Sequence, residues 1–477
     1  MKRFLISAVA TGLALALWMP TSTVLHASDS DLDELQRQVP KKRVVRKKTP
    51  KQAVKKKAAP KKTTRSNTAR RSATPRRAPP RRAAKPRRKI RRVVRARPRE
   101  RAPSGFPPAG ETRFLSGEVI VRFQLASTQA ARDALIRRLN LRHLSGRTFQ
   151  LAGITAHRYQ IASGAAVGSV IRALEASPTV VYAQPNYIYT LQQSDGKKSV
   201  PQYALDVLSI GKVPDAVTGE GVKLAIIDSG ISAKHSELAD ANISLHDVSD
   251  AQDSELRDGH GTSIAGIVSA QKRLRGVARK AAIVGIRAFA KTDSGKTIGN
   301  SWTVARALEV ARDQAAKVIN MSFAGPNDPL VGRSVNGAAR RNMISVAAAG
   351  NAGPTAPTLY PAGYKAVIAV TATDAANALY SKANQGTYIA VAAPGVDVLT
   401  LTPNGAFGAS SGTSLAAAHV SGLAALALQL NGNLNREKFA ALLSRAATDL
   451  GEPGNDPKFG AGLPDAQRMV QSVNPGS

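Results

Sequence analysis

Three side chains of the types needed for acyl transfer stand between residues 228 and 414 of this 477-residue chain. Asp228 follows the apolar run 222–227, His260 lies between two glycines, and Ser414 opens a long alanine-rich segment. An acid, a base and a hydroxyl nucleophile in one domain can attack a carbonyl through a covalent intermediate. The chain contains no cysteine, which excludes a thiolate nucleophile, disulfides and zinc–thiolate sites.

Each of these residues has an ordinary interpretation when it is taken alone. An Asp after a strand commonly caps a turn, a serine at a helix start caps the helix, and a His between glycines marks a tight turn. Asn351, in a loop of small residues after the apolar run 344–348, adds a fourth group. Its amide can donate a hydrogen bond to a developing oxyanion, although a turn-forming Asn is the alternative. The four together favour acyl-transfer chemistry.

The elements that position these residues form a regular pattern from about residue 200 onward. Short runs that are apolar throughout alternate with helical segments, which predicts an α/β domain with a doubly wound, mostly parallel sheet. In such sheets functional side chains gather at the carboxyl ends of the strands. The apolar runs are 222–227, 282–286, 318–321, 344–348, 367–370 and 389–392, and the helical segments are 302–317, 414–430 and 436–447.

A smaller domain is predicted over residues 111–192. Its elements follow the order β-α-β-β-α-β, which is typical of a small α+β, ferredoxin-like fold. The expected strands are 117–123, 148–151, 154–161 and 179–183, and the expected helices are 128–139 and 167–176.

The amino terminus has the pattern of an export signal. Residues 1–27 contain a basic start, an apolar run and a small residue at a cleavage position, which indicates a secretory signal peptide. An uncleaved membrane anchor is the alternative interpretation. The sequence therefore predicts an exported protein, either secreted or kept in the cell envelope (periplasm or surface).

Residues 28–110 differ in composition from the rest of the chain. They are rich in Lys, Arg and Pro and contain one aromatic residue, so we expect a disordered segment. Residues 41–101 carry 29 basic side chains and one acidic one, a net charge of 29 − 1 = +28, whereas residues 193–477 carry 27 − 23 = +4. The total of +36 therefore describes mainly this segment. It could contact polyanions or an anionic cell surface non-specifically, or serve as a solvated spacer.

The four chemical segments together resemble the subtilisin family. They occur in the order Asp, His, Asn, Ser, separated by 32, 91 and 63 residues, and the similarity covers residues 200–470. The resemblance implies a serine endopeptidase in which Ser414 attacks the peptide carbonyl and His260 transfers protons. It implies that Asp228 orients His260, and that the Asn351 side chain and the Ser414 N–H form the oxyanion hole. No cofactor is required for this chemistry.

The resemblance also implies a set of substrate contacts. Ser322, Phe323, Ala324 and Gly325 match the family segment that pairs with an extended substrate. Ala324 stands where a glycine is usual, and its methyl group is expected to narrow the cleft. Leu359 is expected near the floor of the primary specificity pocket.

The resemblance leaves the question of a metal ion open. Glu237 stands where relatives often supply a carboxylate ligand to a structural calcium ion. The six or more oxygen ligands that calcium needs cannot be assembled from the sequence.

The 111–192 domain resembles the propeptide of the family. We therefore expect it to inhibit the enzyme as part of the same chain and to be removed by self-cleavage between residues 190 and 200. The expected partners are protein or peptide substrates and this propeptide. The alternative is an inert protease-like domain carried by the polyanion-binding segment 41–101.

Overall fold

The computed structural model describes residues 104–192, 194–195, 202–251, 259–292 and 294–473. The predicted signal peptide and the basic segment up to residue 103 lie outside the described residues, as do parts of the predicted cleavage region at 193 and 196–200.

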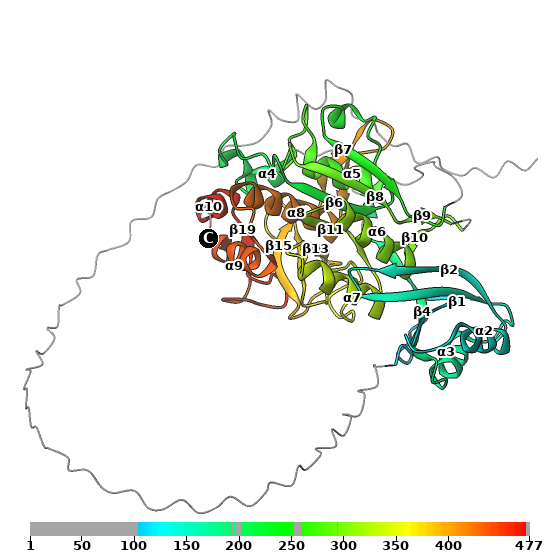
Figure 1. The fold of residues 1–477 in the computed structure, drawn as a ribbon. Helices are drawn as coiled ribbons and strands as arrows, with labels where there is room; N and C mark the ends of the chain where they lie inside the picture. Colours follow the sequence, from blue (N-terminus) through cyan, green and yellow to red (C-terminus); the bar gives the residue numbers. More distant parts are fainter. Residues whose placement is uncertain (1–103, 193, 196–201, 252–258, 293, 474–477) are drawn as a thin grey trace, which may run out of the picture. The chain divides into compact units, whose positions relative to one another are not determined.

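The larger domain is built on a seven-stranded sheet in the order β15-β14-β13-β11-β6-β8-β7 (Figure 1). Every adjacent pair in it is parallel, which confirms the predicted α/β architecture. Strand β7 and helix α7 were not predicted. The strands are β6 (Lys223–Asp228), β7 (Ile243–Asp247), β8 (Ala282–Arg287), β11 (Val318–Met321), β13 (Ile344–Ala348), β14 (Val367–Thr373) and β15 (Ile389–Pro394).

Helices cover both faces of this sheet, and the burial of its strands reflects that. In β6, Leu224 and Ile226 belong to one buried cluster and Ala225 and Ile227 to another. Successive side chains of a strand point to opposite faces, so a strand covered on both sides must be apolar throughout. The helices on the first side are α5 (His260–Ser269), α8 (Thr413–Leu430) and α9 (Arg436–Ala446), and those on the second are α6 (Ser301–Asp313) and α7 (Pro329–Ala339).

Helix α8 is the central helix of the first layer. Among the described residues it alone is long and apolar enough to cross a membrane. Most of its residues are buried inside the large domain, as expected for a core helix.

The small domain has the predicted element order, with a four-stranded antiparallel arrangement β2-β3-β1-β4. Strand β2 is longer than the expected 148–151, because Leu141 already pairs with Ile161 in a hairpin with β3. Packing begins before residue 111: the Gly105 N–H donates to Glu175 at 2.8 Å. The elements are β1 (Phe114–Phe123), α2 (Gln129–Arg138), β2 (Leu141–Phe149), β3 (Ile154–Ile161), α3 (Val167–Glu175) and β4 (Val180–Leu191).

The face of the small sheet opposite its helices rests on α6 and α7 of the large domain. Phe149 meets Trp302 edge to face, with ring centroids 5.0 Å apart. The buried carboxylate of Glu309 accepts hydrogen bonds from the Gln150 and Leu151 N–H groups at 3.0 and 2.7 Å. These contacts combine apolar burial with satisfied backbone donors, so they hold the small domain in a defined position.

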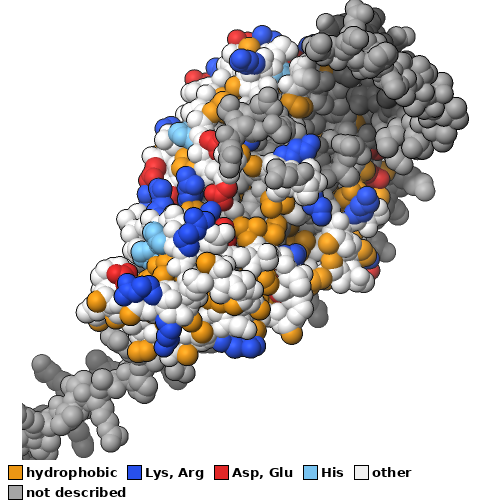
Figure 2. Space-filling model, turned by 90° about the vertical axis from the view of Figure 1, so that its right-hand side faces the viewer, with side chains coloured by type: hydrophobic (Ala, Val, Ile, Leu, Met, Phe, Trp, Pro, Cys, Tyr) orange, Lys and Arg blue, Asp and Glu red, His pale blue; other side chains and the backbone are white. Residues whose placement is uncertain are grey.

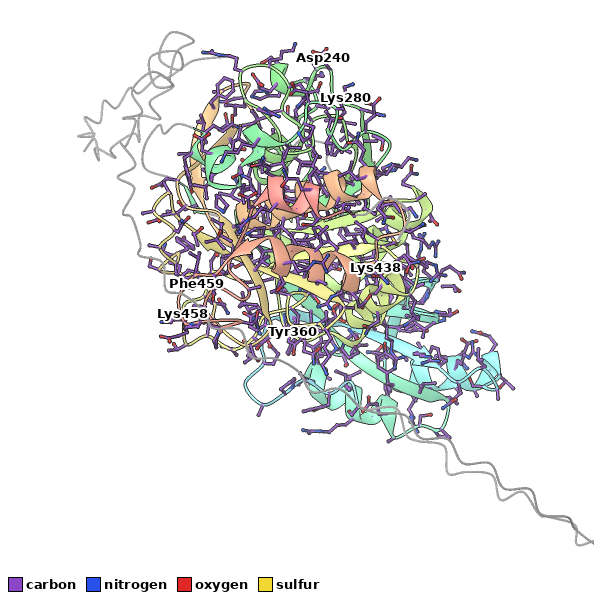
Figure 3. All side chains as sticks on the ribbon, turned by 90° about the vertical axis from the view of Figure 1, so that its left-hand side faces the viewer. Asp240, Lys280, Tyr360, Lys438, Lys458 and Phe459 are labelled. Atoms are coloured by element: carbon purple, nitrogen blue, oxygen red, sulfur yellow. The ribbon has the colours of Figure 1, made fainter. Side chains whose placement is uncertain are left out.

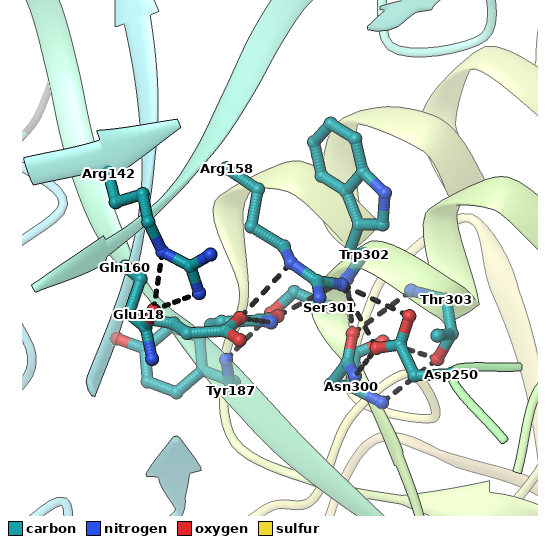
Figure 4. Close-up of polar contacts among 11 residues, drawn as sticks. Glu118, Arg142, Arg158, Gln160, Tyr187, Asp250, Asn300, Ser301, Trp302 and Thr303 are labelled. Atoms are coloured by element: carbon teal, nitrogen blue, oxygen red, sulfur yellow. Dashed lines mark hydrogen bonds and ion pairs between the residues drawn. The ribbon is translucent and has the colours of Figure 1, made fainter. Parts of the chain in front are cut away.

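Polar contacts extend this junction (Figure 4). Arg158 of β3 forms ion pairs with Glu118 at 3.2 Å and with Asp250 of the large domain at 2.9 Å. Asp250 also accepts a hydrogen bond from the Asn300 side chain at 2.9 Å. The hydroxyl oxygen of Ser301 accepts one from the Tyr187 N–H at 2.8 Å. The junction therefore uses groups from both domains.

On the face drawn in Figure 2, Lys and Arg side chains lie among acidic and hydrophobic ones. Charged side chains of both signs are therefore present on this face of the described part.

Strand β4 continues well beyond the expected end at residue 183. Its second half leaves the small sheet and pairs antiparallel with β10 (Thr297–Asn300) and β12 (Phe323–Ala324) of the large domain. The sequence could not reveal this extension, because its partners lie more than 100 residues further along the chain.

Candidate active site

Asp228 is the last residue of β6 and is buried. Both of its carboxylate oxygens lie 2.8 Å from Nδ1 of His260. The Ser229 N–H donates to Asp228 Oδ1 at 2.7 Å. A carboxylate held in this way can fix one tautomer of the imidazole and stabilise its protonated form.

His260 is the first residue of α5, and the flanking glycine makes its approach to Asp228 possible. A Cβ at Gly261 would lie 2.2 Å from the carbonyl oxygen of Gly230, so a larger residue would push the helix away from β6. Close packing at the start of the helix therefore requires a glycine after His260. It brings the imidazole to the carboxyl end of the sheet.

Ser414 is the second residue of α8. Its Oγ lies 2.5 Å from the carbonyl oxygen of Gln192, at the end of the small domain, and 3.0 Å from that of Ser322. The Ser414 N–H also points to the Gln192 carbonyl oxygen at 3.4 Å. The Gln192 carbonyl therefore contacts Ser414 at the amino-terminal end of α8. The positive end of the helix dipole at this point favours negative charge.

Asn351 lies just beyond β13, close to the same carbonyl. Its Oδ1 accepts hydrogen bonds from the N–H and Oγ1 of Thr413, at 3.1 and 2.9 Å. Because the oxygen of the amide is held by two donors, its nitrogen remains on the other side as a hydrogen-bond donor. The Asn351 N–H donates to the Gln192 side chain at 2.9 Å. Asn351 and Ser414 therefore both contact Gln192 of the small domain, and Thr413 holds the Asn351 side chain.

The predicted substrate-pairing segment, residues 322–325, pairs with β4. Phe323 pairs with Leu191 and Ala324 with Thr190, and the Gln192 N–H donates to the Ser322 carbonyl at 3.3 Å. Gly325 forms a bridge with Tyr360, and it also lies against Tyr189 and the Ile188 carbonyl of β4. Its contact with a substrate stays a prediction. Tyr360 lies on the side of the large domain that faces the small domain, away from Asp240 and Lys280 (Figure 3).

A second pairing strand, β10, was not predicted. Gly299 pairs with Tyr189 and Asn300 with Ile188, so residues 188–191 form the middle strand between β10 and β12. Main-chain pairing on both edges is a general way of binding an extended peptide. The sequence signal for β10 is weak, because the strand is only four residues long and contains a glycine.

A cavity of about 280 Å³ opens beside Gln192. Ala324, Asn351, Ala352 and Leu359 line it from the large domain. Leu359 and Ala324 thus both line this cavity. The place of Leu359 in the primary specificity pocket stays a prediction.

His419, further along α8, has no place in this arrangement. Its Nδ1 lies 2.8 Å from the Leu415 carbonyl oxygen, and burial lowers its pKa to about 4. It is a neutral core residue, as the sequence indicated.

The carboxylate of Glu237, the candidate calcium ligand, is bonded to backbone donors. It accepts hydrogen bonds from the N–H groups of Lys272, Arg273 and Leu274 at 3.0, 2.8 and 3.1 Å. Nearby, the Gln202 side chain pairs with both backbone groups of Arg275, at 2.7 and 3.1 Å. Calcium requires six or more oxygens, and this carboxylate faces N–H groups instead. The described residues contain no other cluster of acidic, His or Cys side chains suited to a metal ion.

We therefore expect Glu237 to bind no calcium, so that calcium changes the melting temperature equally in the wild type and in Glu237→Gln. A saturated structural site would add about 2.7 kcal/mol at 100 times its dissociation constant, which corresponds to roughly 5–10 °C in melting temperature for a domain of this size. The difference in melting temperature between EDTA and millimolar calcium, at equal ionic strength, should agree between the two chains within about 1 °C. A calcium-dependent rise that disappears in Glu237→Gln would contradict this assignment.

Comparisons with known proteins agree with the geometry. Residues 219–462 match the subtilase family (Peptidase_S8), and residues 100–186 match the fervidolysin N-terminal prodomain. The chain is 32% identical to subtilisin E of Bacillus subtilis over 308 residues, covering 63% of this chain and 78% of that protein. It is 37% identical to thermitase of Thermoactinomyces vulgaris over 232 residues, covering 47% and 81%.

Solved structures show the same fold. The crystal structure of fervidolysin from Fervidobacterium pennivorans, described as a keratinolytic enzyme related to subtilisin, superposes with a TM-score of 0.66 at 22% identity. The match covers 78% of this chain and 63% of fervidolysin.

Proposed function

Because this chain belongs to the subtilase family of serine proteases and carries a prodomain of the fervidolysin type, we propose that it is an exported endopeptidase that matures by cutting its own chain. The catalytic residues in this proposal are Asp228, His260, Ser414 and Asn351. The functional regions are a signal peptide at 1–27, a basic segment at 28–110, a propeptide at 111–192 and a catalytic domain at 200–470.

The observation that carries the proposal is the position of the Gln192 carbonyl. Its oxygen lies 2.5 Å from Ser414 Oγ and 3.4 Å from the Ser414 N–H. A carbonyl held against a hydroxyl nucleophile and an N–H donor supports the proposal that this peptide bond is the one attacked. The first peptide cut is therefore proposed to be Gln192–Gln193.

The proposed mechanism assigns one role to each of these residues. Ser414 Oγ attacks the Gln192 carbonyl carbon while His260 removes its proton through Nε2. The two Asp228 oxygens keep the proton of the neutral imidazole on Nδ1 and stabilise the imidazolium that forms. The Ser414 N–H and the Asn351 amide bind the oxyanion of the tetrahedral intermediate.

The intermediate then breaks down in two stages. His260 returns the proton to the leaving amine of residue 193, which departs and leaves Gln192 esterified to Ser414. A water molecule, deprotonated by His260, attacks the ester and releases the carboxylate of Gln192. No metal ion or cofactor takes part in any of these proton transfers.

After this cut the propeptide is proposed to stay bound as an inhibitor. Its strand β4 fills the groove between β10 and β12, and its sheet covers α6 and α7 through the Glu309 and Trp302 contacts. Only its displacement or digestion opens the groove to protein or peptide substrates. This makes the precursor a zymogen.

The test is the mass of the matured chain. The wild-type chain without residues 1–27, folded and incubated, is expected to give a fragment that begins at Gln193, identified by intact mass and amino-terminal sequencing. A cut at another position between 190 and 200 would keep the protease assignment and reject the Gln192–Gln193 bond.

A chain that folds and stays whole would favour the second candidate function. That candidate is an inert protease-like domain carried by a polyanion-binding segment at residues 41–101. This segment contains 29 basic residues and one acidic residue. The segment lies outside the described residues, and its charge is the observation that favours this role.

A further inference from the structure

The strand that lies in the groove carries several buried tyrosines, and Tyr189 is the one nearest to Gln192. Tyr189 stands three residues before Gln192 and pairs through its backbone with Gly299 of β10. Its ring leaves the small domain and packs entirely into the large one, in the cluster that contains Phe289 and Phe323. Whatever peptide replaces β4 after maturation must place a side chain at this position.

The ring fits a cavity shaped by residues of the large domain. Phe323 meets Tyr189 edge to face with centroids 5.6 Å apart, and Phe289 packs behind Phe323 at 4.9 Å. A Cβ at Gly325 would lie 2.5 Å from Cδ1 of Tyr189, so any larger residue at 325 would close the cavity to an aromatic ring. The shape alone suits either tyrosine or phenylalanine.

The end of this cavity is polar. The Tyr189 hydroxyl donates to Oδ2 of Asp328 at 3.2 Å, and Asp328 is fully buried. The other oxygen, Oδ1, caps helix α7 by accepting from the Leu330 and Val331 N–H groups at 2.9 and 3.2 Å, and it also accepts from Gln184 at 2.9 Å. The two oxygens therefore have different roles, and Oδ2 faces the phenol.

The protonation states of Tyr189 and Asp328 determine which of them donates the hydrogen bond. Burial raises the pKa of Asp328 overall. Hydrogen bonds from Ser301 and the helix N–H groups, and in the precursor also from Gln184 of the small domain, partly oppose that rise. Burial and the nearby Asp328 raise the pKa of Tyr189 well above its usual value, so its hydroxyl stays protonated and donates. A buried acceptor without a donor costs free energy, so a ring lacking the hydroxyl would be bound less well.

From this geometry we infer that Asp328 is a specificity-determining residue, and that the matured enzyme prefers substrates with tyrosine three residues before the residue whose carbonyl is attacked. The inference rests on the proposed function. It adds a substrate class, because a groove without a buried carboxylate would accept phenylalanine as readily as tyrosine. Sites built to bond a substrate hydroxyl discriminate strongly against the analogue that lacks it.

The test compares three peptides with the matured wild-type enzyme. The first has the chain's own sequence Ile-Tyr-Thr-Leu-Gln-Gln-Ser-Asp with a fluorophore and a quencher. The second replaces tyrosine with phenylalanine, and the third exchanges the first two residues so that tyrosine moves by one position. We expect kcat/KM to fall about 10-fold or more in the second and third peptides, the effect of one hydrogen bond to a charged group.

A matched variant isolates the carboxylate. Asp328→Ser keeps a side-chain oxygen to cap α7, because serine is a preferred capping residue, and removes the oxygen that faces the phenol. The tyrosine-to-phenylalanine ratio of kcat/KM should fall to about one. Both rates come from the same preparation, so a smaller folded fraction cancels in the ratio.

The possible failures are distinguishable. Equal rates for the first two wild-type peptides, or a faster phenylalanine peptide, would overturn the Asp328 inference and leave the protease intact. An unchanged ratio in Asp328→Ser would assign the preference to another group and would also overturn it. Failure to cleave any peptide, or the same residual rate in Ser414→Ala, would instead reject the proposed function.

Discussion

Replacement of Ser414 with alanine is expected to abolish self-cleavage and leave the precursor whole. Without Oγ no acyl-enzyme can form, and removal of a serine nucleophile of this kind lowers kcat by about 10⁶-fold. Intact mass after folding should show only the uncut chain, and the wild-type enzyme added in trans should cut it. Cleavage in trans would establish that the variant chain can be processed.

The control is Ser421→Ala on the same helix. Ser421 is buried and its hydroxyl bonds to Asn320 at 2.9 Å, so the change removes a comparable buried group away from the reacting atoms. This variant should still mature. A Ser414→Ala chain that trims itself at the wild-type rate would show that another nucleophile acts.

Replacement of Asp228 with asparagine is expected to lower kcat for peptide hydrolysis by about 10⁴-fold while the fold is kept. The amide can present an N–H group to His260 Nδ1, which would force the imidazole proton onto Nε2. In that tautomer Nε2 cannot accept the proton of Ser414, so the base is lost although the ring stays in place. Steady-state rates on a fluorogenic peptide, normalised by folded protein, measure the effect.

Asp247→Asn provides the matched control for this change. Asp247 also ends a strand of the same parallel sheet, where it pairs with Arg287 at 3.2 Å, and its side chain is half exposed. Exposed ion pairs contribute little to stability, so its activity should stay near that of the wild type. A loss of less than about 10-fold in Asp228→Asn would remove Asp228 from the catalytic mechanism.

The amino-acid pattern was sufficient to predict both domains and most of their strands. In β6 or β14, four consecutive apolar residues indicate burial on both faces, which only a covered parallel sheet provides. The four proposed catalytic side chains were found for the same reason. Each lies within a few residues of a strand end or at a helix start, so local sequence fixes its place at one edge of the sheet.

The sequence was less informative wherever a contact depends on a distant partner. Strand β4 was expected to end near residue 183, and its extension to Leu191 exists because β10 and β12 offer free edges. Glu237 has the position expected of a metal ligand, yet its oxygens meet the N–H groups of a loop 35 or more residues away. Neither outcome can be read from local propensity, because the deciding atoms belong to other segments.

Sequence alone thus determined the kind of chemistry, since the residue types and their order along a doubly wound sheet allow few other arrangements. Tertiary structure supplied the contacts on which the proposals for the cleaved bond and for the substrate preference rest. The hydrogen bonds between Ser414 and the Gln192 carbonyl and between Tyr189 and Asp328 join residues more than 130 positions apart. Such contacts form only when the chain is folded. The energy of a hydrogen bond depends on its burial and geometry, and local sequence specifies neither.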